Sequence, residues 1–194
     1  MPKISTQEFK RLPLRVHDFL AGVPLHDAWA VDLPRTRSGI TLNEFLRMAN
    51  TRPFRCSPLV RALIWVRLCG GRLLGWDDTP ATTARESFAT RLTTADRASS
   101  LVPAGTPDGL FRVVYRFENE QLLEVINRTV HGAALSALIE METTYRFYFG
   151  VYVRKVNSFT PMYLALIDPF RKLLVYPSLL RSVRTNWDRT VGKA

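Results

Sequence analysis

Four consecutive runs of alternating apolar residues between Leu110 and Val156 constrain the fold more than any other feature of the sequence. They are rich in Val, Ile, Tyr, Phe and Thr, which favour strands. The runs are Phe111–Glu118, Leu122–His131, Leu135–Glu142 and Tyr145–Val156, separated by short polar or glycine-containing turns. Strands joined by short turns pair antiparallel, so this segment predicts a meander sheet.

The parity of each run predicts which side chains share a face, because successive side chains of a strand point to opposite sides. The odd-numbered residues of all four runs are predicted to form one apolar face. The even-numbered residues, which include Arg112, Glu124 and Arg146, are predicted to form a charged face. Such a sheet has one face covered and one face in water.

A stripe of apolar residues at spacings of four and three predicts a long C-terminal helix that begins at Thr160 and covers the apolar face. The stripe consists of Met162, Leu166, Pro169, Leu173, Tyr176, Leu180, Val183 and Trp187. Its phase continues through Pro169 and Pro177, so the helix is expected to be kinked rather than divided. The predicted fold class is therefore α+β, with an antiparallel meander packed on a long, Pro-kinked helix.

The N-terminal half predicts shorter elements. Phe9, Leu12, Val16 and Phe19 suggest one amphipathic helix, and Ala28–Leu33 a strand followed by two short helices. The two helices are expected over 41–49, which begins with a capping box, and over Leu59–Cys69. Residues 76–108 are expected to be loop or weakly helical and to cover a site. The length of 194 residues predicts one domain over 1–194.

Several stretches carry a resemblance over nearly the whole chain. HDAWAVDLP, YRFENEQLLEVINRTVH, VYVRKV and PMYLALIDPFRKLLVYPSLL resemble a bacterial family of unknown function, which has no assigned catalytic residues. The predicted arrangement of sheet and helix resembles the START-like helix-grip fold. That resemblance implies a hydrophobic cavity between sheet and helix. Many START-like proteins bind lipids, polyketides or other apolar molecules, and some catalyse cyclisation or dehydration.

Seven residues are candidates for contact with a ligand in such a cavity: Tyr115, Asn127, Thr129, His131, Tyr145, Phe147 and Phe149. Period 2 places Asn127, Thr129 and His131 together on the apolar face. Buried polar groups need partners, which here are one another, ordered water or a ligand. His131 is also a candidate general base. The structural alternative is that His131 ends its strand and caps a turn into Gly132.

Metal and nucleotide motifs are missing from the sequence. His17, His26 and His131 do not lie four residues apart, and Cys56 and Cys69 form no CxxC pair. There is no GxGxxG, GxxxxGK[ST] or GxSxG motif. We therefore expect no metal and no cofactor. His26 and Asp27 are interpreted as a surface pair, and Asp168 as an ion-pair partner of Arg171 or Lys172.

The charge of the chain bears on possible macromolecular partners. The formal net charge is +10, with the excess of basic residues concentrated after Arg154. Glutamates alternate with the arginines of the meander and would repel the phosphates of a nucleic acid. The sequence therefore argues against a nucleic-acid partner. A solvated basic surface is the simpler interpretation, and weak contact with an anionic membrane is an alternative.

The sequence also favours the cytoplasm. The N-terminus lacks the apolar core of a signal peptide, two cysteines are too few for a disulfide framework, and every long apolar stretch carries charges. The leading functional hypothesis is a non-catalytic protein that binds a small hydrophobic molecule between the sheet and the C-terminal helix. The alternatives are a START-like enzyme that uses His131 as general base, and a peripheral module at an anionic membrane.

Overall fold

The structure is a computed structural model that describes residues 3–48, 65 and 86–191. Its core is a six-stranded antiparallel sheet with the order β1-β6-β5-β4-β3-β2. The strands are β1 (Leu25–Pro34), β2 (Pro107–Asp108), β3 (Phe111–Arg116), β4 (Glu120–Ile126), β5 (His131–Glu140) and β6 (Thr144–Arg154). The predicted meander is confirmed, and the predicted N-terminal strand pairs with β6 as β1.

Short helices surround the sheet: α1 (Thr6–Lys10), α2 (Val16–Phe19), α3 (Leu42–Met48), the 3-10 turn η2 (Phe88–Arg91) and α6 (Thr94–Ser99). The single N-terminal helix of the sequence prediction is wrong, because the chain breaks between α1 and α2 around Pro13. The helix predicted over 41–49 is found as α3. The helix predicted over Leu59–Cys69 and the first part of the predicted cover, 76–85, lie outside the described residues.

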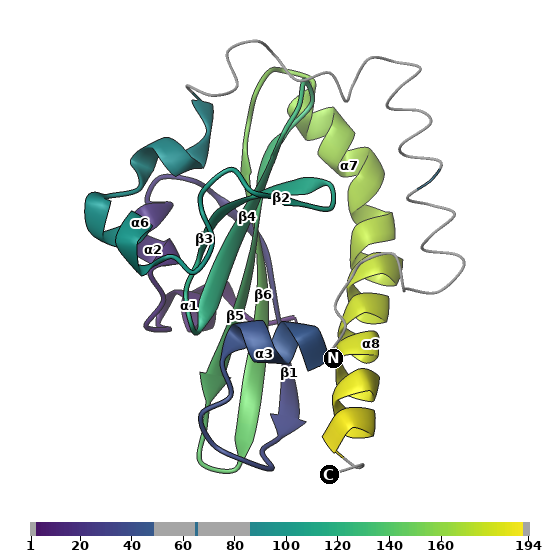
Figure 1. Cartoon of the computed structure of the whole chain (residues 1–194). Coiled ribbons are helices and arrows are strands. Elements are labelled where there is room, and N and C mark those ends of the chain that lie inside the picture. Colours follow the sequence, from purple (N-terminus) through teal and green to yellow (C-terminus); the bar gives the residue numbers. More distant parts are fainter. Residues whose placement is uncertain (1–2, 49–64, 66–85, 192–194) are drawn as a thin grey trace.

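The C-terminal helix runs without interruption along one face of the sheet (Figure 1). It consists of α7 (Thr160–Phe170), the π-helical turn η3 (Arg171–Val175) and α8 (Tyr176–Val191). The long helix and the α+β class are therefore confirmed. No helix among the described ranges has the length and apolar character needed to cross a membrane.

The predicted buried stripe of this helix is correct only for its second half. Leu180 and Trp187 are fully buried, but Met162, Leu166 and Leu173 are 60, 61 and 73% exposed. The π-helical turn contains one more residue per turn than an α-helix, so it shifts the inward face by about one position. In α7 that inward face carries Tyr163 instead.

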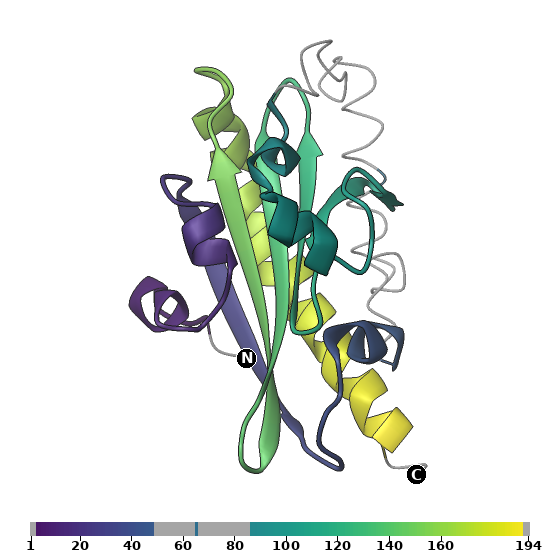
Figure 2. The same ribbon diagram turned by 60° about the vertical axis from the view of Figure 1, so that its left-hand side comes forward.

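Both faces of the sheet are covered. Figures 1 and 2 show the C-terminal helix on one side and α1, α2 and α6 on the other. The helix face packs Trp29, Phe147 and Trp187 into one cluster. The opposite face packs Phe9 and Phe88 into a second cluster. The predicted charged, water-exposed face is therefore wrong.

The predicted sorting of side chains by parity also fails. The register between β5 and β6 pairs Glu140 with Tyr145, so facing residues have opposite parity and odd-numbered residues of the two strands lie on opposite faces. Leu135 faces away from the helix, together with Tyr115. Phe147 faces the helix. The number of residues in each turn sets this relation, and apolar alternation within a strand does not reveal it.

Candidate functional site

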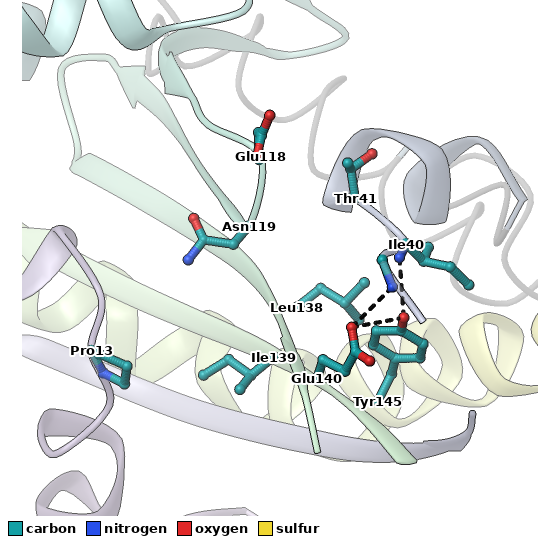
Figure 3. Close-up of a pocket in the computed structure, with 10 residues that line it drawn as sticks. Pro13, Ile40, Thr41, Glu118, Asn119, Leu138, Ile139, Glu140 and Tyr145 are labelled. Atoms are coloured by element: carbon teal, nitrogen blue, oxygen red, sulfur yellow. Dashed lines mark hydrogen bonds between the residues drawn. The ribbon is translucent and has the colours of Figure 1, made fainter. Parts of the chain in front are cut away.

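An open pocket of about 310 Å³ lies at one end of the sheet (Figure 3). This volume is at the lower end of the range of about 300–1,000 Å³ for small-molecule sites. The lining comes from two N-terminal loops, the β3–β4 turn and the adjoining ends of β5 and β6. It consists of Pro13, Gly39, Ile40, Thr41, Glu118, Asn119, Leu138, Ile139, Glu140 and Tyr145.

A step in the sheet creates this pocket. β5 continues to Glu140, whereas β4 begins at Glu120, which pairs with Ala137. Beyond that pair, the hydrogen bond from Leu138 N to Asn119 O (2.8 Å) is the last link between β5 and the β3–β4 turn. The space that a longer β4 would occupy is left open as the pocket.

Tyr145 and Glu140 form the polar wall of the pocket. The Tyr145 hydroxyl accepts a hydrogen bond from Ile40 N (3.1 Å). Its proton can go to Arg37 O (3.0 Å) or to Glu140 Oε2 (3.2 Å). Gly39 N donates to the same carboxylate oxygen (3.0 Å). These bonds fix the hydroxyl and the carboxylate in place (Figure 3).

The backbone of the neighbouring loop keeps the Glu140 side chain ionised. Gly39 has φ 73°, a left-handed conformation that favours glycine. The hydrogen bond from its N–H, with further bonds from Tyr145 and Arg35, holds the pKa of Glu140 below its ordinary value. Glu140 is therefore a carboxylate at neutral pH, and it accepts hydrogen bonds from a ligand rather than donating them.

A second polar group joins β1 to the C-terminal helix. His26 Nε2 lies 2.7 Å from Asp168 Oδ2 and 3.7 Å from Asp27 Oδ2. Asp168 is also paired with Lys172 (2.8 Å) and Arg171 (3.2 Å). The predicted pairing of Asp168 within its helix is confirmed. The predicted surface position of Asp27 is wrong, because this residue points to the helix side of β1 and is buried.

Opposing effects act on Asp168. Burial acts to raise its pKa, but the hydrogen bonds from Lys172 and His26 outweigh burial and bring the pKa below its ordinary value. Asp168 is therefore ionised at neutral pH. Lys3 Nζ lies 3.4 Å from Asp27 Oδ1, so a second cation approaches the cluster from the N-terminal segment.

Two carboxyl groups of β4 are buried on the face away from the C-terminal helix. The Tyr115 hydroxyl donates to Glu120 Oε1 (2.8 Å). Burial raises the pKa of Glu120 to about 7, against hydrogen bonds from Tyr115 and from the backbone of Arg15 and Val16 at the start of α2. Glu120 thus stands near the midpoint of its titration at neutral pH.

His131 lies on the same face and is fully buried. Its Nε2 is 3.2 Å from Glu124 Oε2, and its ring stacks on Phe88 with centroids 3.9 Å apart. Burial acts to raise the pKa of Glu124, but hydrogen bonds from His131, Ser87 and the Phe88 backbone outweigh it and lower the pKa. Phe88 therefore covers a face of the imidazole, and Glu124 occupies its Nε2.

Asn127 and Thr129 do not belong to a strand, which corrects the predicted run of three polar residues. β4 ends at Ile126 and β5 begins at His131. Asn127 Oδ1 accepts hydrogen bonds from Thr129 N (3.0 Å) and Thr129 Oγ1 (2.8 Å) and so closes the turn between the strands. Thr129 O in turn accepts a bond from Thr160 Oγ1 (2.8 Å), which anchors the start of α7.

The seven candidate residues are therefore not brought together in one place. Tyr115 and His131 lie on the face away from the C-terminal helix, and Asn127 and Thr129 lie in a turn. Tyr145, Phe147 and Phe149 lie on the helix face, where Phe149 contacts Tyr176 with centroids 5.5 Å apart. Of the seven, only Tyr145 lines the pocket.

Sequence reasoning missed the remaining pocket residues and the approach of His26 to Asp168. The pocket residues lie in loops and strand ends, where no periodicity exists. His26 and Asp168 are 142 residues apart in the chain. The available signal was their polarity, because each interrupts a largely apolar stretch of the sequence.

Comparison with known protein families identifies a model that matches most of the chain. The family model described as "Protein of unknown function (DUF2867)" matches residues 19–178, which include β1, the meander and most of the C-terminal helix. No curated protein and no solved structure matches the chain with significance.

Proposed function

The chain belongs to the DUF2867 family of proteins of unknown function, and we propose that it is a non-catalytic binding protein for a small molecule with an apolar body and a polar end. The observation that carries this proposal is the pocket at the end of β5, where an apolar wall meets a fixed hydroxyl and carboxylate. Ligand pockets typically combine such an apolar lining with a few well-placed polar groups.

The lining indicates the chemistry of the ligand. Leu138, Ile139 and Ile40 offer apolar surface, whereas Glu140 and Glu118 offer carboxylates. Arg35 compensates Glu140 through an ion pair of 2.8 Å. The free hydrogen-bonding capacity is therefore mainly that of acceptors, which suits a hydroxyl or an amine. An anionic end would be repelled.

The same wall argues for binding over catalysis. Glu140 is held ionised by three hydrogen-bond donors, which makes it a poor proton acceptor near neutral pH. No histidine or cysteine lines the pocket among the described residues. His131, the candidate base, is buried on the other face of the sheet.

The pocket adjoins the packed interior between sheet and helix, where the helix-grip resemblance implies a cavity, because Tyr145 and Leu138 belong to both. The Tyr145 ring contacts Trp187 of α8 with centroids 6.0 Å apart. Trp187 also contacts Phe45 of α3, so aromatic rings fill this end of the interior. We therefore place the ligand at the mouth of the sheet–helix interior, beside Tyr145.

The substitution Asn119→Trp tests this placement. Asn119 is exposed on the β3–β4 turn and lines the pocket, so an indole there should obstruct the pocket without disturbing the core. We expect at least tenfold weaker binding of a neutral apolar dye such as Nile red, equivalent to about 1.4 kcal/mol. Native mass spectrometry of the same proteins would detect any co-purified ligand.

Glu142→Trp is the matched control. Glu142 is exposed on the β5–β6 turn and does not line the pocket. It should bind the dye as the unmodified protein does. Equal dye affinity in the two tryptophan variants, or no saturable binding to the unmodified chain, would contradict the proposed pocket.

A second candidate function is contact with an anionic membrane surface. The outer side of α7 and η3 carries a row of exposed apolar residues, Met162, Leu166, Phe170 and Leu173. Exposed arginines of α8, among them Arg181 and Arg184, lie further along the same C-terminal helix. Apolar side chains next to basic ones are the composition by which a helix lies on an anionic lipid surface.

Leu166→Asp combined with Phe170→Asp tests membrane contact. Both residues are exposed, so the fold should persist while cosedimentation with phosphatidylserine-containing vesicles falls at least tenfold. Thr185→Asp with Thr190→Asp makes the same change in charge on exposed positions of α8 and should weaken binding less. Vesicle binding that is absent in the unmodified chain, or equal in both double variants, would refute this function.

A further inference from the structure

Asp27 is a fully buried carboxylate whose two oxygens lack hydrogen bonds among the described residues. Its nearest polar neighbours stay at longer distances, with Lys3 at 3.4 Å, His26 at 3.7 Å and Lys172 at 4.0 Å. A buried carboxylate without hydrogen bonds is unfavourable unless another charge is present.

The neighbours of Asp27 supply a set of metal-ligating atoms. One ligand atom each from His26, Asp27 and Asp168 can be chosen so that all three lie within 4.8 Å of one another. Ligands at about 2.0–2.2 Å from a zinc-sized ion lie roughly 3–3.5 Å apart, so small side-chain movements would bring these atoms into coordination distance. One imidazole and two carboxylates suit Zn²⁺, Co²⁺, Mn²⁺ or Fe²⁺.

We propose that His26, Asp27 and Asp168 form a binding site for one divalent transition-metal ion between β1 and the C-terminal helix. The two carboxylates carry the charge that such an ion neutralises. The imidazole favours a first-row transition metal over Ca²⁺ or Mg²⁺. The site shares no residue with the pocket beside Tyr145.

Lysines stand in for the ion when the site is empty. Lys172 Nζ contacts Asp168 at 2.8 Å, and Lys3 Nζ is the nearest cation to Asp27. The Lys172 and Lys3 side chains are 35 and 56% exposed, so both can turn into water when an ion enters. Each lysine competes with the ion for a carboxylate.

An irregular turn of the C-terminal helix lies next to the proposed metal site. Asp168 lies three residues before the π-helical turn Arg171–Val175. π-helical turns inside α-helices are rare and occur frequently at functional sites. Arg171 is bound to the Tyr176 hydroxyl as well as to Asp168, so it is held to one side of the cluster.

Cobalt binding to the purified full-length protein tests the site, because Co²⁺ reports its ligands through visible absorption bands. We expect one Co²⁺ per chain and displacement by Zn²⁺. His26→Gln and Asp168→Asn, at partly exposed positions, should each weaken Co²⁺ binding at least tenfold. Thermal melting of each metal-free variant shows whether it remains folded. Glu142→Gln removes an exposed carboxylate elsewhere and should leave affinity unchanged.

Lys172→Gln separates a metal site from an ordinary ion-pair network. Removal of the competing ammonium group should strengthen Co²⁺ binding by threefold or more. It should also lower the stability of the metal-free protein, because Asp168 loses an ion-pair partner. No saturable Co²⁺ binding by the unmodified chain would overturn the proposal. Binding that persists in both His26→Gln and Asp168→Asn would place the ion elsewhere, for example on Cys56 or Cys69, and would also overturn it.

Discussion

An aspartate at Phe147 or at Tyr148 is expected to abolish cooperative folding, although the two residues are adjacent and point to opposite faces of β6. Phe147 packs on Phe45 at 4.9 Å between ring centroids, on the helix side. Tyr148 packs near Phe9 at 6.4 Å, on the other side. Loss of a buried aromatic side chain costs about 3–5 kcal/mol. The unpaired buried carboxylate costs several more, which approaches a typical total stability of about 5–15 kcal/mol.

Thermal melting and soluble yield measure this effect. Met141→Asp, at a position 40% exposed in the β5–β6 turn, is the control and should melt nearly as the unmodified protein does. If Tyr148→Asp melted cooperatively like the control, the face that packs on α1 and α2 would be accessible to water. The conclusion that both faces of the sheet are covered would then be wrong.

The contribution of Glu120 to the stability of the protein is expected to fall as the pH rises from about 4.5 to 7. Burial raises the pKa of Glu120 in the folded protein from 4.5 to about 7. Between these values the folded state holds a proton that the unfolded state has released, so rising pH favours unfolding. The shift corresponds to about 3 kcal/mol, which is fully expressed above pH 7.

Glu120→Gln should remove this dependence. The amide keeps an oxygen for the Tyr115 hydroxyl and cannot ionise. Urea unfolding at pH 5 and pH 8 would show that the variant gains about 2–3 kcal/mol relative to the unmodified chain at the higher pH. A constant difference between the two proteins across this range would mean that Glu120 titrates normally in the folded state.

The strands and the long helix were predictable because their signals are local. β-branched and aromatic residues alternate within each strand, and this pattern does not depend on the rest of the chain. The faces were not predictable in the same way. Asn127 closes a turn with its own side chain, and the sequence around it alternates as a strand does, so the predicted strand ran on to His131.

The phase of the C-terminal helix was ambiguous for a related reason. Met162 and Tyr163 are neighbours and both are hydrophobic, so either can begin an apolar stripe. The stripe through Met162 fits Trp187 only when every turn is α-helical, and the π-helical turn makes Tyr163 the buried residue. No residue type specifies a π-helical turn, so the sequence pattern alone could not locate it.

The candidate sites depend on contacts between distant parts of the chain. Glu140 and Tyr145 are close in sequence. Their pocket, however, also needs the loop at Gly39 and the β3–β4 turn, which are distant in the chain. His26 meets Asp168 only when β1 lies beneath the C-terminal helix. Spacing rules find ligands on one helix or one strand, and they do not find pairs that tertiary packing assembles.

The π-helical turn is a position at which related chains can differ in length by one residue. Thr160 is tied to the turn after β4, and Trp187 Nε1 donates to Pro34 O (3.0 Å), so both ends of the helix are anchored to the sheet. Deletion of one residue within Arg171–Val175 would let this turn become α-helical, while the segment before it keeps its rotation relative to α8. Tyr163 would then stay inward and Met162 outward. Relatives without the π-helical turn should therefore show a one-residue gap here, with the apolar positions on both sides of the gap still aligned.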